Sequence, residues 1–344
     1  MVKIGIVGGR LYEMVRLHPY RKWMDLLDND DIEKFDGDEW TPIEAAYVAS
    51  ITHKYKDAEV VFIDRFDEKL LQQNDVNFLV GLNILNAFQI NKKAYEKQLK
   101  IMQNPKNNIY PPHKEQQFLF HKGTYHEYFI KKGIPMAPTF IIRKDRNVKN
   151  ILKKIRQKGW KSFVLKPEYA YANIKVVKFD TDEKNVEKKL QRYLTQTKKY
   201  PGWVCQETML GFKKYWEIKT FWINGEYKYH LAIKADVFDM EEDFGKVNKG
   251  LIDQVKKIAK KVIKEFPKTK INGKEIMPPM LRLDFGCCQG NTLDKSKYFF
   301  TEMEYSGCGT FVDYSSTFLR FYTDVYYKKA KEIKMLKDKN KSKK

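Results

Sequence analysis

Two apolar segments near the end of the chain, LRLDFG and FFTEMEY, carry charged residues at alternate positions. Successive side chains of a β-strand point to opposite faces, so Arg282 and Asp284 would share one face of a sheet. Glu302 and Glu304 would likewise share a face, and the turn-rich GNTLDKSK between the segments predicts that the two strands pair. The pattern therefore predicts three carboxylates on one sheet face, where they repel one another unless a cation neutralises them.

These acids could instead be ordinary surface residues on a solvent-exposed sheet face. Both segments are too apolar to lie open to water, which favours a metal site at Asp284, Glu302 and Glu304. All-oxygen ligands suit a hard ion such as Mg²⁺, which in enzymes bridges a few carboxylates to substrate phosphates. We therefore expect a divalent ion there, Mg²⁺ first and Mn²⁺ as its substitute.

Length and composition indicate a globular protein. With 344 residues, of which 42% are apolar, the chain can bury a large core in two or three domains. The 14% aromatic content argues against disorder, and no apolar run is long enough to predict a membrane span. The first residues have the pattern of a strand rather than of a signal peptide. The four cysteines lack CxxC spacing, so we expect a reducing, cytoplasmic location.

The chain is strongly basic. Its formal net charge is +21, and residues 328–344, with nine lysines and two acids, supply +7 of it. A solvated, frayed helix end explains this run without a function, and we expect residues 331–344 to form a basic flexible tail. Attraction to a polyanion is the functional alternative. Nucleic-acid-binding modules interleave basic and exposed aromatic residues in recognisable motifs, and no such motif occurs, so nucleic acid is not an expected partner.

The first third of the chain alternates apolar strands with helical stretches, which predicts a parallel α/β sheet. The predicted strands are residues 3–8, 59–64 and 76–83. Gly8-Gly9, after the first strand, does not complete a dinucleotide-binding fingerprint, and we interpret it as structural. A polar, proline-containing stretch at 104–117 predicts a domain boundary.

Amphipathic helices and strands follow this boundary. The predicted helices are residues 147–160, 182–196 and 248–266, and Asn224-Gly225 predicts a tight hairpin turn. Residues 162–179 have the pattern of two strands joined by a loop. The second part of the chain therefore mixes helices with antiparallel strands.

Several polar residues in these elements suit a nucleotide site, although each alone could be an ordinary surface residue. Lys166 ends an apolar strand and Lys122 opens a helix, positions from which a lysine can hold phosphate as a point charge. Gln206 and Glu207 end another apolar strand and could meet a purine and a ribose. Two further charged residues, Glu217 and Lys219, lie two positions apart and therefore on one strand face.

In their order and spacing these motifs resemble the ATP-grasp superfamily over roughly residues 118–310. The matching elements, in chain order, are Lys122 ahead of Gly133-Ile134-Pro135, Lys166-Pro167, the phosphate-covering loop EYAYANIK, Gln206-Glu207, Glu217-Ile218-Lys219 with the Asn224-Gly225 hairpin, Arg282-Leu283-Asp284-Phe285, and Glu302-Met303-Glu304. Each element is weakly specific, whereas the ordered set is considerably more so.

The resemblance implies a mixed fold, α/β and α+β. An N-terminal parallel α/β domain (1–115) would precede a two-subdomain ATP-grasp fold. That fold would comprise a small subdomain (116–200) and a catalytic subdomain (201–330), followed by the basic tail.

The resemblance also implies roles for individual residues. Lys122 and Lys166 would contact the phosphates of ATP. The rest of the nucleotide-binding set would comprise Gln206, Glu207, Glu217 and Lys234. One or two Mg²⁺ ions would be held by Asp284, Glu302 and Glu304, while Arg282 and Lys219 would stabilise charge on the transferred phosphoryl group.

Three features of the sequence depart from the family pattern. The covering loop lacks the usual glycines. Lys219 stands where arginine is common, which loses bidentate geometry but keeps the charge. Glu304 replaces the usual asparagine and adds a negative charge to the metal site.

The implied activity is that of a ligase, in which ATP activates a substrate carboxylate as an acyl phosphate for attack by an amine. A kinase acting on an anionic acceptor such as an inositol phosphate is the first alternative, and a non-catalytic nucleotide-binding protein is the second. The complete acid set argues against the second. The basic surroundings of the site favour an anionic acceptor, either a small molecule or a peptide.

Overall fold

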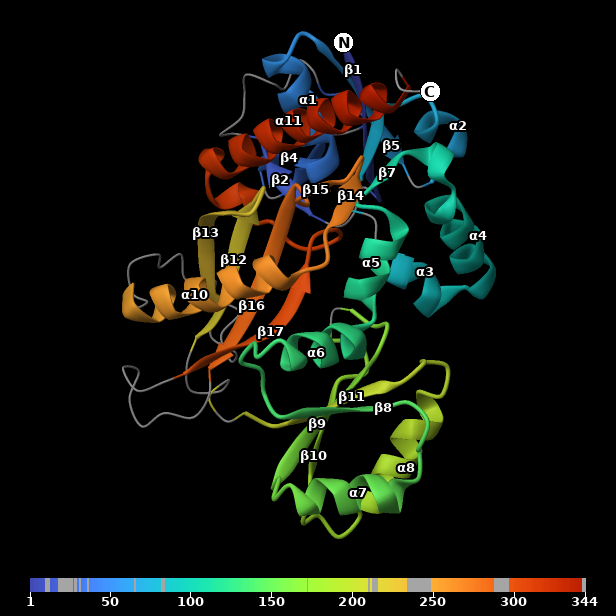
Figure 1. Ribbon diagram of the computed structural model, residues 1–344, viewed down its shortest axis with the longest axis vertical. Coiled ribbons are helices and arrows are strands. Elements are labelled where there is room, and N and C mark those ends of the chain that lie inside the picture. The colour runs from blue at the N-terminus through green and yellow to red at the C-terminus, as the bar shows by residue number, and fades with distance from the viewer. Residues whose placement is uncertain are drawn as a thin grey trace.

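The computed structural model describes residues 1–9, 13–17, 27, 30, 32–35, 37–64, 66–81, 84–171, 173–209, 211, 216–233, 249–287 and 297–341. The described elements form three units along the long axis of the molecule (Figure 1). An N-terminal α/β unit lies at one end, an antiparallel sheet from the C-terminal third lies in the middle, and a small subdomain lies at the other end.

The N-terminal sheet is parallel, as the sequence predicts. Its strands, in spatial order, are β5 (Ala58–Asp64), β1 (Val2–Gly8), β6 (Val76–Leu79) and β7 (Ile109–Tyr110). Alternate residues of β1 enter two different cores. One core includes α1 (Ile43–Lys54) and α11 (Ser316–Lys341), and the other includes α2 (Glu68–Leu71), α3 (Ile84–Ile90) and α4 (Lys92–Gln103).

Local signals in this unit did not reveal every strand. A second sheet, formed by β2 (Met14–Arg16), β4 (Asp38–Pro42) and β3 (Glu33–Phe35), occupies a stretch where the sequence predicts only a helix. These strands are short and half-exposed, so their apolar alternation is weak. Gly8 and Gly9 contact the carboxylate of Glu44 on α1, which supports a structural role for this pair.

The small subdomain (residues 139–207) is an antiparallel sheet with helices on it. The strand order is β10 (Val177–Asp180), β9 (Ser162–Pro167), β11 (Trp203–Glu207) and β8 (Thr139–Ile142). The helices are α7 (Val148–Gln157) and α8 (Val186–Gln196). Its apolar core contains only residues between 142 and 205, so the subdomain packs as a separate body.

The limits of this subdomain differ from those expected. We placed its end at residue 200, but β11 lies beyond that position and pairs with both β8 and β9. We also placed its start at 116, whereas α5 (His113–Phe120) and α6 (Lys122–Lys131) pack into the main core with the C-terminal sheet. Sequence periodicity defines elements but not the layer in which each one packs, which explains both differences.

The C-terminal sheet is antiparallel, in the order β13 (Glu226–Ile233), β12 (Glu217–Ile223), β16 (Met280–Cys287) and β17 (Tyr298–Glu304). The helix α10 (Lys249–Glu265) lies across this sheet (Figure 1). It buries one apolar side, which begins at Leu251. Shorter elements complete the chain: η3 (Pro105–Asn107), a hairpin of β14 (Thr269–Ile271) and β15 (Lys274–Ile276), and η5 (Val312–Tyr314). None of the described helices is long and apolar enough to cross a membrane.

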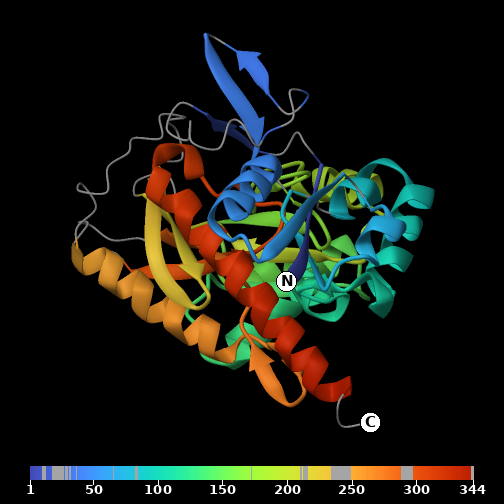
Figure 2. The same cartoon turned by 90° about the horizontal axis from the view of Figure 1, so that it is seen from above.

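The long helix α11 joins the two large units. Viewed from above, it crosses the molecule between α1 and the β12–β13 hairpin (Figure 2). The sequence predicts a flexible tail from residue 331, but this helix continues to Lys341 and buries Ala330, Ile333 and Leu336. Its lysines also bind the N-terminal unit: Lys331 lies 2.8 Å from Asp57, and Lys334 lies 2.7 Å from Asp75.

The lysine-rich composition concealed this role, because the apolar positions of α11 are spaced among charges that mostly face the surface.

Ile333→Ala is expected to lower the free energy of unfolding by about 2–4 kcal/mol, since it removes a buried side chain at an interface between units. Met335→Ala, at a position that is 50% exposed on the same helix, serves as the control and should change it by less than about 0.5 kcal/mol. Urea titration followed by circular dichroism measures the free energy of unfolding of both variants. Equal losses in the two variants would contradict the docking of α11.

Candidate functional site

The predicted pairing of the two strands is confirmed, and the register brings the charged residues of three strands onto one sheet face. Lys219 of β12 pairs with Asp284 of β16, which in turn pairs with Glu302 of β17. Two residues away along the same pair of strands, Arg282 pairs with Glu304. Since residues two apart on a strand share a face, Glu217 joins the same group.

Asp284 is the centre of this group. Its carboxylate is only 3% exposed and accepts hydrogen bonds from Lys219 Nζ at 2.8 Å and from Arg282 Nε at 3.0 Å and Nη2 at 3.1 Å. Lys219 also donates to Glu217 at 2.9 Å, and Arg282 Nη2 lies 2.5 Å from Glu304. Alternating positive and negative side chains therefore neutralise one another across the sheet, which makes the burial of so many charges tolerable.

Two lysines approach this face from other elements. Lys122, at the start of α6, binds the carboxylate of Glu302. Lys166, at the end of β9, donates to Gln206 Oε1 at 3.1 Å. Burial lowers the pKa of Lys166, and the negative charge of Glu302 partly opposes this shift. The predicted lysines thus meet at the junction of the small subdomain and the main body.

The two glutamates of β17 differ in their proton affinity. Burial raises the pKa of Glu302, but Lys122 and other nearby positive charges outweigh it and hold that pKa at about 2. Burial raises the pKa of Glu304 to about 7, because Arg282 offsets only part of the cost while also neutralising Asp284. Since Glu302 and Glu304 are neighbours, their protons are lost as a coupled pair.

The fit of these residues to a metal ion can be judged from their contacts. Within the described ranges, no group of three or more His, Cys, Asp or Glu side chains is arranged as a metal cluster. Both oxygens of Asp284 are held by basic residues, whereas Glu302 and Glu304 keep 30% and 24% of their side-chain surface exposed. The donor chemistry suits a hard cation, and these two glutamates are the members of the set that such an ion could reach directly.

The covering loop after Lys166 makes its turns without glycine. Tyr169, Asn173 and Lys175 have φ values of 65°, 55° and 57°, in the left-handed region that glycine favours. For a bulky residue such as Tyr169 this conformation is strained. Its ring is 2% exposed, and its hydroxyl is 2.8 Å from that of Tyr95 on α4. Packing against the N-terminal unit therefore holds the loop in place at this position.

A small cavity of about 30 Å³ lies beside the two glutamates, beneath this loop. Lys122, Glu302 and Glu304 line one side, and Ala170 and Tyr171 of the loop line another. A space of that size holds water but not a nucleotide.

The structure gives less information on the two remaining predicted residues, Glu207 and Lys234. Glu207, at the end of β11, is half-buried and lies on the strand that also carries Gln206. Lys234 lies outside the described residues. Sequence reasoning missed two acids: Glu13, which accepts hydrogen bonds from Thr310 and Phe311, and Glu168, which binds Arg143. Neither acid stands in a periodic pattern that would single it out.

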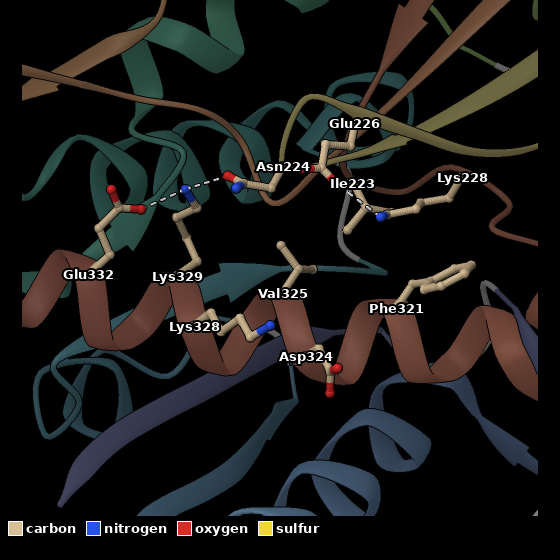
Figure 3. Close-up of a pocket in the computed structure, with 10 residues that line it drawn as sticks. All are labelled: Ile223, Asn224, Glu226, Lys228, Phe321, Asp324, Val325, Lys328, Lys329 and Glu332. Atoms are coloured by element: carbon tan, nitrogen blue, oxygen red, sulfur yellow. Dashed lines mark hydrogen bonds and ion pairs between the residues drawn. The ribbon is translucent and has the colours of Figure 1, made fainter.

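A larger pocket of about 250 Å³ lies elsewhere, between the β12–β13 hairpin and α11 (Figure 3). Its charges cancel: Lys329 binds Asn224 at 2.8 Å and Glu332 at 2.7 Å, and Lys228 binds Glu226 at 2.9 Å. None of the predicted site residues lines this pocket.

Similarity to known proteins is found in the structure of the chain rather than in its sequence. No protein-family model matches the sequence, and no curated protein matches it either. A solved D-cycloserine synthetase is similar over 95% of this chain and 99% of its own, with a TM-score of 0.63 and 11% identity. A D-alanine–D-alanine ligase from Bacillus anthracis, solved with ATP, is similar over 97% and 99%, with a TM-score of 0.59 and 12% identity.

A third similar structure is the ATP-grasp ligase PsnB, solved with a minimal precursor, Mg and ADP. It is similar over 95% of this chain and 98% of its own, with a TM-score of 0.51 and 13% identity. These likenesses establish the fold: the chain has the ATP-grasp fold, which the ordered motifs predicted for roughly residues 118–310. The likeness itself extends over nearly the whole chain.

Asp284→Asn is expected to lower the free energy of unfolding by about 3–5 kcal/mol, because it leaves two buried cations with less compensation. The matched control is Asp180→Asn on the small subdomain, whose carboxylate is 64% exposed and pairs with Lys178. That exposed pair should contribute less than about 1 kcal/mol. Denaturant titration compares the two variants, and a similar loss in both would mean that Asp284 is not the centre of the network.

Glu304 should make stability depend on pH. Its pKa rises from 4.5 to about 7 on folding, so its contribution is fully present below pH 4.5 and is lost as pH rises through about 7. In Glu304→Gln this loss should vanish, so the variant gains stability relative to the parent between pH 5 and pH 8. Denaturation midpoints at the two pH values measure the effect. Glu187→Gln, an exposed change on α8, should retain the parent's pH profile.

Proposed function

We propose that this chain is an ATP- and Mg²⁺-dependent ligase that activates a carboxylate as an acyl phosphate for attack by an amine. The observation that carries the proposal is the meeting of Lys122 and Lys166, from two separately packed units, opposite the carboxylates of β16 and β17. The ATP-grasp fold supports it, since similar structures include ligases solved with ATP or with Mg and ADP.

Each residue then has a defined task. Lys122 and Lys166 hold the phosphates of ATP as point charges. The adenine and ribose lie against Gln206 and Glu207, with Glu217 and Lys234 completing the nucleotide-binding set. Arg282 and Lys219 stabilise the charge that develops on the transferred phosphoryl group, in a site whose donors are already oriented.

Of the three predicted ligands, Glu302 and Glu304 would hold one or two divalent ions, which neutralise the charge of the phosphates when bound. The triphosphate would compete with Glu302 for the Lys122 ammonium. Phosphate binding would therefore release Glu302 from its ion pair and make it available as a ligand. Asp284 would remain mainly a structural anion, because Lys219 and Arg282 already occupy both of its oxygens.

The chemistry needs no nucleophilic side chain. A carboxylate oxygen of the substrate attacks the γ-phosphorus of ATP, and the bond to ADP breaks. The amine then attacks the acyl carbon, forms the amide and expels phosphate, while the amine proton passes to solvent or to phosphate. The basic character of the chain, with net charge +21, supports an anionic small-molecule or peptide acceptor. A cytoplasmic location is consistent with Cys205 and Cys308, which are buried and form no disulfide.

The test uses Glu302→Gln and Glu304→Gln, since Asp284→Asn disturbs folding. ATP consumption with Mg²⁺ and a library of carboxylates and amines should fall by about 10²-fold or more in each variant, because each loses a carboxylate that would hold the divalent ion. Glu183→Gln, a surface change on the small subdomain, serves as the control.

Mass spectrometry of the products identifies the reaction. An amide with free phosphate supports the ligase. A phosphoester would instead establish a kinase, and normal turnover by both glutamine variants would remove the metal assignment.

A further inference from the structure

Glu168, two residues after Lys166, is a buried acid that the proposed chemistry does not use. It is 1% exposed, and Arg143 binds it with both arms of its guanidinium: Nε lies 3.0 Å from one oxygen and Nη2 lies 2.8 Å from the other. A bidentate pair of this kind is strong and directional. The same arginine reaches α6, where Nη1 lies 2.8 Å from Glu127 and Nη2 lies 3.4 Å from Thr124.

Two glycines make room for this carboxylate. A Cβ atom on Gly123 would lie 2.1 Å from Glu168 Oε1, and a Cβ on Gly202 would lie 2.5 Å from Oε2. Neither glycine has a positive φ, so close approach rather than backbone conformation requires glycine at both positions. The Glu168 carboxylate therefore rests directly against the backbone of the residue that follows Lys122.

This contact joins two bodies whose apolar cores are separate. Glu168 and Arg143 follow strands β9 and β8 of the small subdomain, whose core is its own. Gly123, Thr124 and Glu127 belong to α6, which packs into the main core through Phe129 and its neighbours. The Arg143–Glu127 ion pair and the close approach of Glu168 to Gly123 thus span the junction between the body that carries Lys166 and the body that carries Lys122.

We propose that Glu168 and Arg143 form a positioning clamp that fixes the small subdomain at the distance where Lys166 and Lys122 bind the same phosphates. Neither residue touches the reacting atoms. Glu168 holds Lys166 through the strand they share and holds Lys122 through the backbone of Gly123. The interpretation of the two lysines as phosphate ligands rests on the proposed function, whereas the fixed orientation of the two bodies does not.

A geometric role can be separated from a purely structural one. If the pair only stabilised the fold, weakening it would lower the melting temperature and leave the affinity of the folded protein for ATP unchanged. If it sets the separation of two phosphate-binding lysines, weakening it also raises the KM for ATP, because both cations must reach one ligand. Small displacements in such sites have large effects on binding and rate.

Arg143→Lys is the primary test, because it keeps the charge that neutralises Glu168 but loses the fork that orients it. We expect the KM for ATP, and the Kd of Mg-ATP measured by calorimetry, to rise about 10-fold, with kcat within about 3-fold of the parent. The matched control is Arg146→Lys. Arg146 is three residues away, lies over the ring of Trp203 and does not contact Glu168, so its variant should keep the parent's Kd.

Gly123→Ala tests the same clamp without changing any charge. The new methyl group would displace the Glu168 carboxylate from Arg143, while alanine favours the helix that contains it. We expect the same rise in Kd as in Arg143→Lys, together with a lower melting temperature, because the buried ion pair is disturbed. A parent-like Kd in both variants, alongside ATP binding by the parent, would overturn the clamp while leaving the proposed function intact.

A measurement without nucleotide decides the question even when the parent does not bind ATP, which would itself overturn the proposed function. Spin labels at Lys184→Cys on the small subdomain and Lys260→Cys on α10 occupy exposed positions in the two bodies. Their distance distribution should be narrow in the parent and in Arg146→Lys, and broader in Arg143→Lys. Equal widths in all three proteins would overturn the clamp.

Discussion

Charge compensation across one face of the C-terminal sheet is the constraint on which the rest of the structure depends. An anion as buried as Asp284 is tolerated only because a lysine from one neighbouring strand and an arginine from its own strand share its two oxygens. That arrangement fixes the register of β12, β16 and β17, since a slip of one residue would send every charge to the opposite face. It also sets the charges of the glutamates, because Arg282 cannot fully neutralise both Asp284 and Glu304.

The site itself exists only where two bodies meet. The main body supplies the acids, Arg282 and Lys122, and the small subdomain supplies Lys166 and Gln206. Because its core is separate, the small subdomain can move as a unit relative to the main body. A defined contact between the two is then needed to fix the position of Lys166 relative to Lys122. The Glu168–Arg143 pair and the docked ring of Tyr169 provide contacts of that kind, one to α6 and one to the N-terminal unit.

Much of this could be predicted from the sequence, for reasons that differ between elements. Alternating charge in β16 and β17 predicted their shared face because the period of a strand is two. The ordered motifs predicted the ATP-grasp fold through their order along the chain, with Lys122 at a helix start, Lys166 near a strand end and Asp284 within a strand. The docking of α11 was missed, since lysines outnumber the buried positions of its last turns. Glu168 and Tyr169 were missed because their partners, Arg143 and Tyr95, lie in other elements, and local periodicity carries no information about such contacts.

The placement of α11 has a consequence for the order in which the protein can form during synthesis. Strand β1 near residue 2 and the turns of α11 beyond residue 330 belong to one core, so that core joins segments separated by most of the chain. On the ribosome, β1 must wait for α11 before its face is covered, and contacts between such distant segments form slowly. The small subdomain, whose core spans only residues 142–205, can fold while the rest is still being translated. The small subdomain is thus the part of the molecule that can fold first.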